Sequence, residues 1–158
     1  MRLKNRFFWI AAVISLILDQ LSKYLVIQNL GLNATIPLLT DVFHFTYVRN
    51  TGAAFSLFQG GVWLRWLSLL VSIGLIALAW FGPILNKFEQ LGYGFILGGA
   101  LGNGIDRFAY GYVVDFLDFR LIKFPVFNLA DTFINVGIIC LLIASFWQTA
   151  PPTESRRR

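Results

Sequence analysis

Four long apolar segments restrict the fold of this chain more than any other feature of its sequence. They comprise residues 7–27, 62–81, 92–110 and 128–147, and each has about the 20 residues that a helix needs to cross a bilayer. Hydrophobic residues make up 57% of the 158-residue chain, too large a share for a soluble domain of this size. The sequence therefore predicts an all-α membrane protein with four transmembrane helices in one domain, residues 1–150. Only the basic tail, residues 151–158, is expected to be disordered.

The first apolar segment follows basic residues, as in a secretory signal peptide. It is too long for the apolar part of such a peptide, and no small-residue cleavage site follows it promptly, so we interpret it as a retained helix. Four spans place both termini on one side, and the basic N-terminal segment and the tail ESRRR predict that this side is the cytoplasm. Six basic residues fall toward the other side and weigh against this orientation: Lys23, Arg49, Arg65, Arg107, Arg120 and Lys123.

Two further segments, residues 29–61 and 111–127, lie outside the predicted helices on the outer side. The first alternates apolar and polar residues around positions 42–48 and has a turn signal at Asn50-Thr51-Gly52, a pattern typical of short strands. We therefore expect a small extracytoplasmic β-rich segment between the first and second helices. Both segments are rich in Phe, Leu and Val, so we expect them to lie on the membrane surface.

Ionisable residues inside such apolar segments are expensive and commonly functional. If the first and third spans run outward and the fourth runs inward, the aspartates of the predicted spans and of the second outer segment all fall near the outer interface. They are accompanied there by amide and basic side chains, and the group comprises Asp19, Asn50, Asn103, Asp106, Arg107, Asp115, Asn128 and Asp131. The third span also carries Gly94, Gly98 and Gly102 at four-residue spacing, a pattern that allows close helix packing.

Structural roles for these residues remain open alternatives. Asp19 and Lys23 are four residues apart and can neutralise each other at the end of a span. Asp131 can be an acid at a helix start, favoured by the helix dipole, with Asn128 as its cap. Asp106, beside Arg107, can orient loops by hydrogen bonds.

The residue types present restrict the chemistry that such a group can perform. The chain has one histidine and one cysteine, so we expect neither a metal site nor a cofactor. Its net charge of +5 comes from basic residues at the termini and loops, which topology explains, so nucleic acid is not an expected partner. The nucleophile elbow Gly-x-Ser-x-Gly is absent from the sequence. Two carboxylates in a poorly hydrated site share a proton, and one then activates water while the other polarises a carbonyl. Asp115 and Asp131 are candidates for such an aspartic protease pair.

Five sequence blocks resemble, in order and along the whole chain, the lipoprotein signal peptidases (signal peptidase II), which are bacterial intramembrane aspartic proteases. No single block is specific, but five in order with four apolar segments form a specific signal. The blocks are DQLSK (19–23), RNTGAAFS (49–56), GGALGNGIDR (98–107), GYVVDFLDF (111–119) and FNLAD (127–131).

The resemblance implies that Asp115 and Asp131 are the catalytic dyad. It further implies a set of residues that support the site or contact substrate: Asp19, Lys23, Asn50, Gly52, Asn103, Asp106, Arg107, Asn128 and Ala130. The implied substrate is a prolipoprotein with a diacylglyceryl group on a cysteine, cleaved just before that cysteine at the outer face of the bacterial inner membrane. We expect a monomer whose other partners are membrane lipids.

Two other functions are weighed against this one. A small transporter would use clustered acids as a proton or cation pathway, but the sequence lacks an inverted repeat and signals of broken helices at the midplane. A non-enzymatic membrane scaffold leaves the intramembrane acids without a role.

Overall fold

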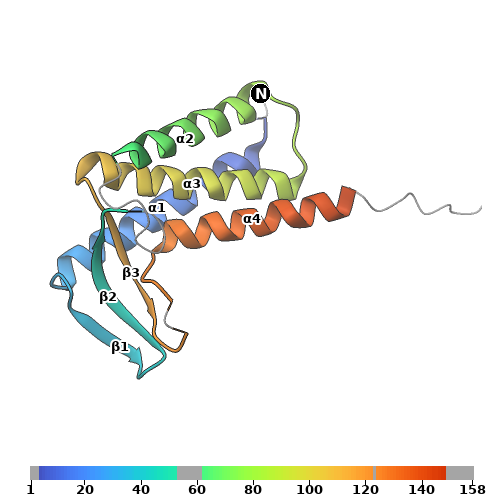
Figure 1. Cartoon of the computed structure of the whole chain (residues 1–158). Coiled ribbons are helices and arrows are strands. Elements are labelled where there is room, and N and C mark those ends of the chain that lie inside the picture. Colours follow the sequence, from blue (N-terminus) through green and yellow to red (C-terminus); the bar gives the residue numbers. More distant parts are fainter. Residues whose placement is uncertain (1–3, 53–61, 123, 149–158) are drawn as a thin grey trace, which may run out of the picture.

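The computed structural model describes residues 4–52, 62–122 and 124–148. Along the chain it contains α1 (Arg6–Asn29), β1 (Thr35–Leu39), β2 (Phe43–Asn50), α2 (Trp63–Phe81), α3 (Lys87–Ala109), β3 (Val113–Phe119) and α4 (Leu129–Gln148) (Figure 1). The four predicted helices are confirmed as helices. The predicted tail, residues 151–158, and part of the block at 49–56 lie outside the described residues.

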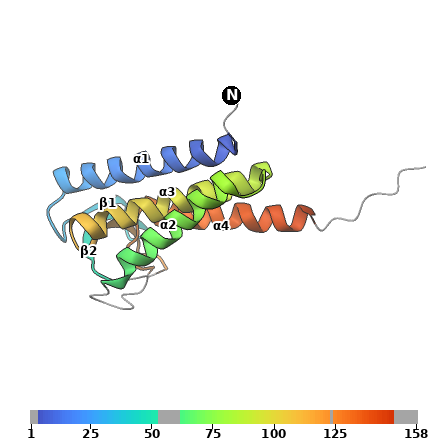
Figure 2. The ribbon, with the colours of Figure 1, turned by 90° about the horizontal axis from the view of Figure 1, so that it is seen from above.

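Helix α3 lies in the middle of the bundle and packs against each of the other three helices (Figures 1 and 2). Its glycines make this possible, because a Cβ at Gly94 would lie 2.4 Å from the carbonyl oxygen of Phe8 in α1. A Cβ at Gly99 would lie 2.4 Å from the carbonyl oxygen of Ala130 in α4. The predicted close packing along Gly94, Gly98 and Gly102 is confirmed, because a Cβ at each of them would meet atoms of α1. Gly99 packs against α4 and was not part of that prediction. Helix α3 begins at Lys87 rather than at residue 92, because Asn86 and Glu89 form a capping box.

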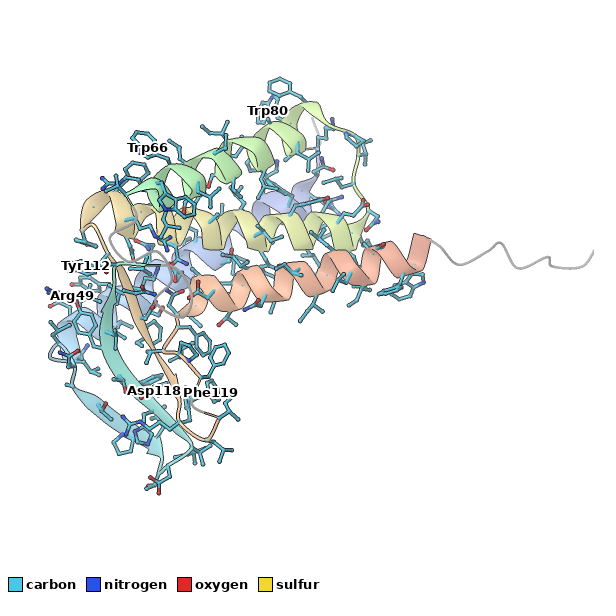
Figure 3. All side chains as sticks on the ribbon, in the orientation of Figure 1. Arg49, Trp66, Trp80, Tyr112, Asp118 and Phe119 are labelled. Atoms are coloured by element: carbon cyan, nitrogen blue, oxygen red, sulfur yellow. The ribbon has the colours of Figure 1, made fainter. Side chains whose placement is uncertain are left out.

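Three of the four helices, α1, α2 and α4, are long and apolar enough to cross a membrane by length and composition. Their outward surfaces are rich in exposed apolar side chains. On α2 these include Trp66 and Trp80, near the two ends of the helix (Figure 3). Helix α3 has a similar length but is less apolar than the other three helices. Many of its residues are glycine or polar, and these residues are buried where α3 packs against the other helices. The described residues thus contain three candidate membrane-spanning helices, and the fourth span stays a prediction.

The strands form one antiparallel sheet in the order β1-β2-β3 at one end of the bundle (Figure 1). The prediction of a β-rich segment between the first two helices was incomplete, because β3 lies between α3 and α4. Val113–Phe119 pairs with β2 along its length, and its buried side chains Val114 and Phe116 join Val26 and Tyr47 in a core. This core attaches the sheet to the end of α1. Long-range pairing of this kind leaves no local turn signal in the sequence.

The helix ends nearest the sheet are the C-terminal ends of α1 and α3 and the N-terminal ends of α2 and α4 (Figure 1). The predicted polar residues are concentrated at these ends. The bundle and the sheet therefore bring segments from the whole chain to one place.

Candidate active site

The two predicted catalytic aspartates come from different elements. Asp115 lies in β3 and is 2% exposed, whereas Asp131 lies in the first turn of α4. Asn128 contacts both of them: its Nδ2 donates to Asp115 Oδ1 at 2.7 Å, and its backbone N–H donates to Asp131 Oδ2 at 3.3 Å. The structure thus brings both carboxylates within hydrogen-bonding distance of one asparagine.

Asn128 also caps helix α4. Its Oδ1 accepts a hydrogen bond from the backbone N–H of Asp131 at 3.0 Å, while Asp131 accepts one from the backbone N–H of Asn128. This reciprocal pair is a capping box formed by Asn and Asp. The alternative that Asp131 is an acid at a helix start, capped by Asn128, is therefore confirmed, and it holds together with the proximity of Asp131 to Asp115.

The environment of Asp115 alters its protonation. Burial raises the pKa of the Asp115 carboxyl to about 7, and the nearby Asp131 carboxylate contributes to the rise. Hydrogen bonds from Asn50 Nδ2, at 2.9 Å, and from Asn128 lower the pKa, as does the charge of Lys23. Because burial outweighs these donors, the Asp115 carboxyl is partly protonated near neutral pH.

A buried group of charges lies behind the aspartates. Lys23 Nζ is 2.9 Å from Asp19 Oδ2 and 3.0 Å from Asp106 Oδ2, and it donates to Asn103 Oδ1 at 2.9 Å. Asn103 Nδ2 in turn donates to Asp131 Oδ1 at 2.8 Å. The predicted Asp19–Lys23 pair is confirmed, and Asp106 is a second partner of the same ammonium group.

The remaining predicted site residues are also in this region. The backbone N–H of Ala130 donates to Asp19 Oδ1 at 2.9 Å. The backbone N–H of Gly52 donates to Asn50 Oδ1 at 2.9 Å, and the carbonyl oxygen of Gly52 accepts from Arg107 Nη2 at 3.3 Å. Every residue of the predicted set is therefore part of one connected region.

A cavity of about 720 Å³ opens beside the aspartates. One part of its wall is polar and includes both carboxylates, and the other is apolar and comes from β2, β3, the segment before α4, and α4 itself. The lining residues are Val48, Arg49, Asn50, Thr51, Asn103, Arg107, Val113, Asp115, Phe124, Pro125, Val126, Phe127, Asp131, Thr132, Ile134, Asn135, Val136 and Ile139. Arg49 and Tyr112 lie where the sheet meets the helices, and Asp118 and Phe119 lie farther along the sheet (Figure 3).

Sequence reasoning missed several residues of the site region. Gln20 Nε2 lies 3.2 Å from Asp19 Oδ2 and 3.1 Å from Asp106 Oδ1, and so links the two acids. Its position inside the block DQLSK was an available signal. Asn135 and Ile139 follow Asp131 at four-residue intervals, and helical periodicity alone places such residues on one face. Phe124 and Pro125 carried no comparable signal.

Comparisons with known proteins agree with this arrangement. Residues 11–147 match the model of a protein family described as signal peptidase (SPase) II. A lipoprotein signal peptidase of Nostoc punctiforme is 69% identical to this chain over 99% of both proteins. A lipoprotein signal peptidase of Microcystis aeruginosa is 71% identical, over 90% of this chain and 94% of the relative.

The fold is similar to that of a solved bacterial membrane enzyme determined by the in meso method. The TM-score is 0.84 at 30% sequence identity, and the alignment covers 94% of this chain and 93% of that chain. A match over most of the sequence thus accompanies a match over most of the fold. The chain belongs to the signal peptidase II family of proteases, which cleave the signal peptides of prolipoproteins.

Proposed function

We propose that Asp115 and Asp131 are the catalytic dyad with which this enzyme removes the signal peptide from diacylglyceryl-modified prolipoproteins, cutting just before the lipidated cysteine. One observation carries this proposal: both carboxylates line the same cavity and both accept a hydrogen bond from Asn128. Like charges this close in a poorly hydrated site cannot both ionise cheaply, so the pair holds one proton.

The shared proton gives the two carboxyl groups complementary roles. The ionised carboxylate takes a proton from a water molecule, and the water oxygen attacks the carbonyl carbon of the scissile peptide. The protonated carboxyl transfers its proton to the carbonyl oxygen, which gives a neutral tetrahedral intermediate. When this intermediate collapses, the C–N bond breaks and the leaving amine takes a proton from the carboxyl that accepted one from water. A hydroxyl of the intermediate returns its proton to the other carboxylate, so the acid product forms and the dyad again holds one proton.

The amide side chains around the dyad support this chemistry. Asn50 and Asn128 donate to Asp115, while Asn103 donates to Asp131. These donors favour the ionised form of each carboxyl and so oppose burial, which favours the neutral form. Arg107 lines the same cavity, and we infer that its guanidinium donates to a carbonyl of the bound substrate.

The apolar wall of the cavity suits a lipid-modified substrate. Val136 and Ile139 of α4 line the cavity and are also 38% and 55% exposed on the outside of the helix. A cavity that continues onto a lipid-facing helix surface can admit acyl chains from the bilayer without moving them through water. We infer that the diacylglyceryl group lies along this wall, with the peptide at the polar end.

The membrane topology follows from the same arrangement. We infer that α3 is a fourth transmembrane helix, so that residues 1–150 form one four-span domain of a monomer in the inner membrane. Both termini are then cytoplasmic and the dyad is near the outer face. Cysteine accessibility at Lys87 and at Leu121, exposed residues at the start of α3 and beyond its end, tests this after substitution of each by Cys in a Cys140→Ala background: labelling from opposite sides is expected, and labelling from the same side would contradict it.

A gel-shift cleavage assay with the purified enzyme tests the substrate class. We expect cleavage of a diacylglyceryl-prolipoprotein and none of the same precursor with its lipobox cysteine replaced by alanine, which cannot be lipidated. Equal cleavage of both precursors would contradict the proposed lipid requirement. A proton or cation pathway would instead give ion flux into liposomes, which we do not expect.

A further inference from the structure

Three charged residues are buried together behind the dyad, and the proposed chemistry does not use them. Asp19, Lys23 and Asp106 are 0%, 2% and 2% exposed, respectively. Burying an ion pair commonly costs more in lost hydration than the pair regains, so such a group is weak evidence for stability by itself. The position of these charges relative to the aspartates points to another role.

Each acid of this group holds the backbone immediately before one catalytic aspartate. Asp19 Oδ1 accepts from the N–H of Ala130 at 2.9 Å, and Ala130 precedes Asp131. Asp106 Oδ2 accepts from the N–H of Val114 at 3.1 Å, and Val114 precedes Asp115.

Lys23 binds both acids, at 2.9 and 3.0 Å. The distance between the start of α4 and strand β3 therefore depends on the distance between two carboxylates bound to one ammonium group.

Lys23 also determines how the amide of Asn103 is oriented. An ammonium group only donates hydrogen bonds, so the atom of Asn103 that it contacts at 2.9 Å must be the oxygen. The NH₂ group of Asn103 then points at Asp131 Oδ1.

The same oxygen of Asn103 accepts from Asn128 Nδ2 at 3.0 Å, and that NH₂ group also reaches Asp115 Oδ1. One cation therefore fixes donors to both carboxylates. With the amide of Asn103 reversed, its oxygen would face the oxygen of Asp131.

We propose that Lys23 is a positioning residue for catalysis: through Asp19, Asp106 and Asn103 it sets the separation of the two catalytic aspartates and directs amide donors toward both. The proposal rests on the assignment of Asp115 and Asp131 as the dyad. The simpler alternative is that Lys23 only neutralises Asp19 and Asp106, so that its loss would affect folding and nothing else.

Two variants separate these roles. Lys23→Met keeps most of the side-chain volume but leaves two buried acids without a counter-charge. The triple variant Lys23→Met/Asp19→Asn/Asp106→Asn removes all three charges, and the amide oxygens of the new asparagines can still accept from Ala130 and Val114. The triple variant has no unpaired buried charge at these positions, but it still lacks the ammonium group that donates to Asn103.

The measurements are the melting temperature, kcat and KM for a diacylglyceryl-prolipoprotein in detergent micelles. We expect Lys23→Met to lower kcat by about 100-fold, as for misplacement of reacting groups by about 1 Å, with KM within threefold. We expect the triple variant to melt near the wild-type temperature and still to have a kcat at least tenfold below wild type. Ser15→Ala is the control, because Ser15 is 0% exposed on the same helix and, among the described residues, its hydroxyl donates only to Ala11 and Ala12 of that helix; the kcat of this variant should be unchanged.

Each other result contradicts the proposal. A folded variant of either kind with kcat within threefold of wild type shows that Lys23 is only a counter-charge. Failure of the triple variant to fold shows that the charges, and not the hydrogen bonds that they direct, are what the structure needs. Asp131→Asn is measured in parallel: if it is active, the dyad is wrong, whereas if it is inactive and the Lys23 variants are active, only the positioning role is wrong.

Discussion

Gly99 of α3 links helix packing to catalysis, and its replacement by alanine tests that link. A Cβ at this position would lie 2.4 Å from the carbonyl oxygen of Ala130 and 2.7 Å from Ile134 Cγ1. Ordinary contacts are about 3.5–4.0 Å, so α3 and α4 must separate by roughly 1 Å. Overpacking of this kind costs about 1–3 kcal/mol, and the better helix propensity of alanine offsets up to about 1 kcal/mol of it.

The expected net loss of about 1–2 kcal/mol corresponds to a fall in melting temperature of about 2–8 °C for a chain of this size. Because Ala130 precedes Asp131, the same shift moves the carboxylate, and a displacement of about 1 Å costs kcat on the order of 100-fold. Thermal unfolding followed by tryptophan fluorescence and a gel-shift cleavage assay measure the two effects.

Two other glycines serve as matched controls. Gly94→Ala meets the carbonyl oxygen of Phe8 at the same 2.4 Å, but far from the aspartates, so it should lower the melting temperature with little change in kcat. Gly74→Ala on α2 meets no described atom within 4 Å and should change neither. If Gly99→Ala behaves like Gly74→Ala in both assays, the argument from close packing at the start of α4 is wrong.

Two further predictions concern the protonation of Asp115. Asn50→Ala removes a donor that lowers the pKa of Asp115, so the carboxyl should keep its proton to higher pH; the alkaline limb of the profile of kcat/KM against pH should move upward, and an unmoved limb would contradict the role of Asn50. The pKa of Asp115 in the folded protein, about 7, is above its unfolded value of 3.8, so the folded state binds more protons between these values and its stability falls as pH rises through this window. The melting temperature of the wild type should fall more between pH 5 and pH 8 than that of Asp115→Asn, and equal falls would refute this assignment.

The sequence predicted the helices well because their signal is local. Each of the four apolar segments is long enough to mark a helix by composition alone, and the glycines at 94 and 98 indicated close packing. The sheet was predicted only in part, since β2 has an alternating pattern whereas the pairing of β3 with β2 joins residues far apart in the chain. Such register depends on how the helices bring the two segments together.

Prediction of the site depended on two kinds of information. Topology placed the acids near one interface, and the resemblance to a family assigned the dyad. Asp106 does accept a hydrogen bond from the segment after α3, at the backbone N–H of Val114, as the structural alternative expected. Neither kind of information could predict that Asp106 also binds Lys23, because that contact depends on side-chain direction across two helices. The block DQLSK marked the position of Gln20, but the hydrogen bonds from Gln20 to Asp19 and Asp106 depend on α1 and α3 lying side by side.

The most direct test of the proposed dyad is the turnover of Asp115→Asn and Asp131→Asn in the gel-shift assay, with Asp118→Asn as the matched control. Asp118 is on the same strand as Asp115 but binds Thr46 and Arg120 and does not line the cavity. We expect each dyad variant to be folded by thermal unfolding and to lose at least about 10³-fold in kcat, as for removal of a reacting group, while Asp118→Asn stays within threefold of wild type. Wild-type turnover by either folded dyad variant would contradict the account.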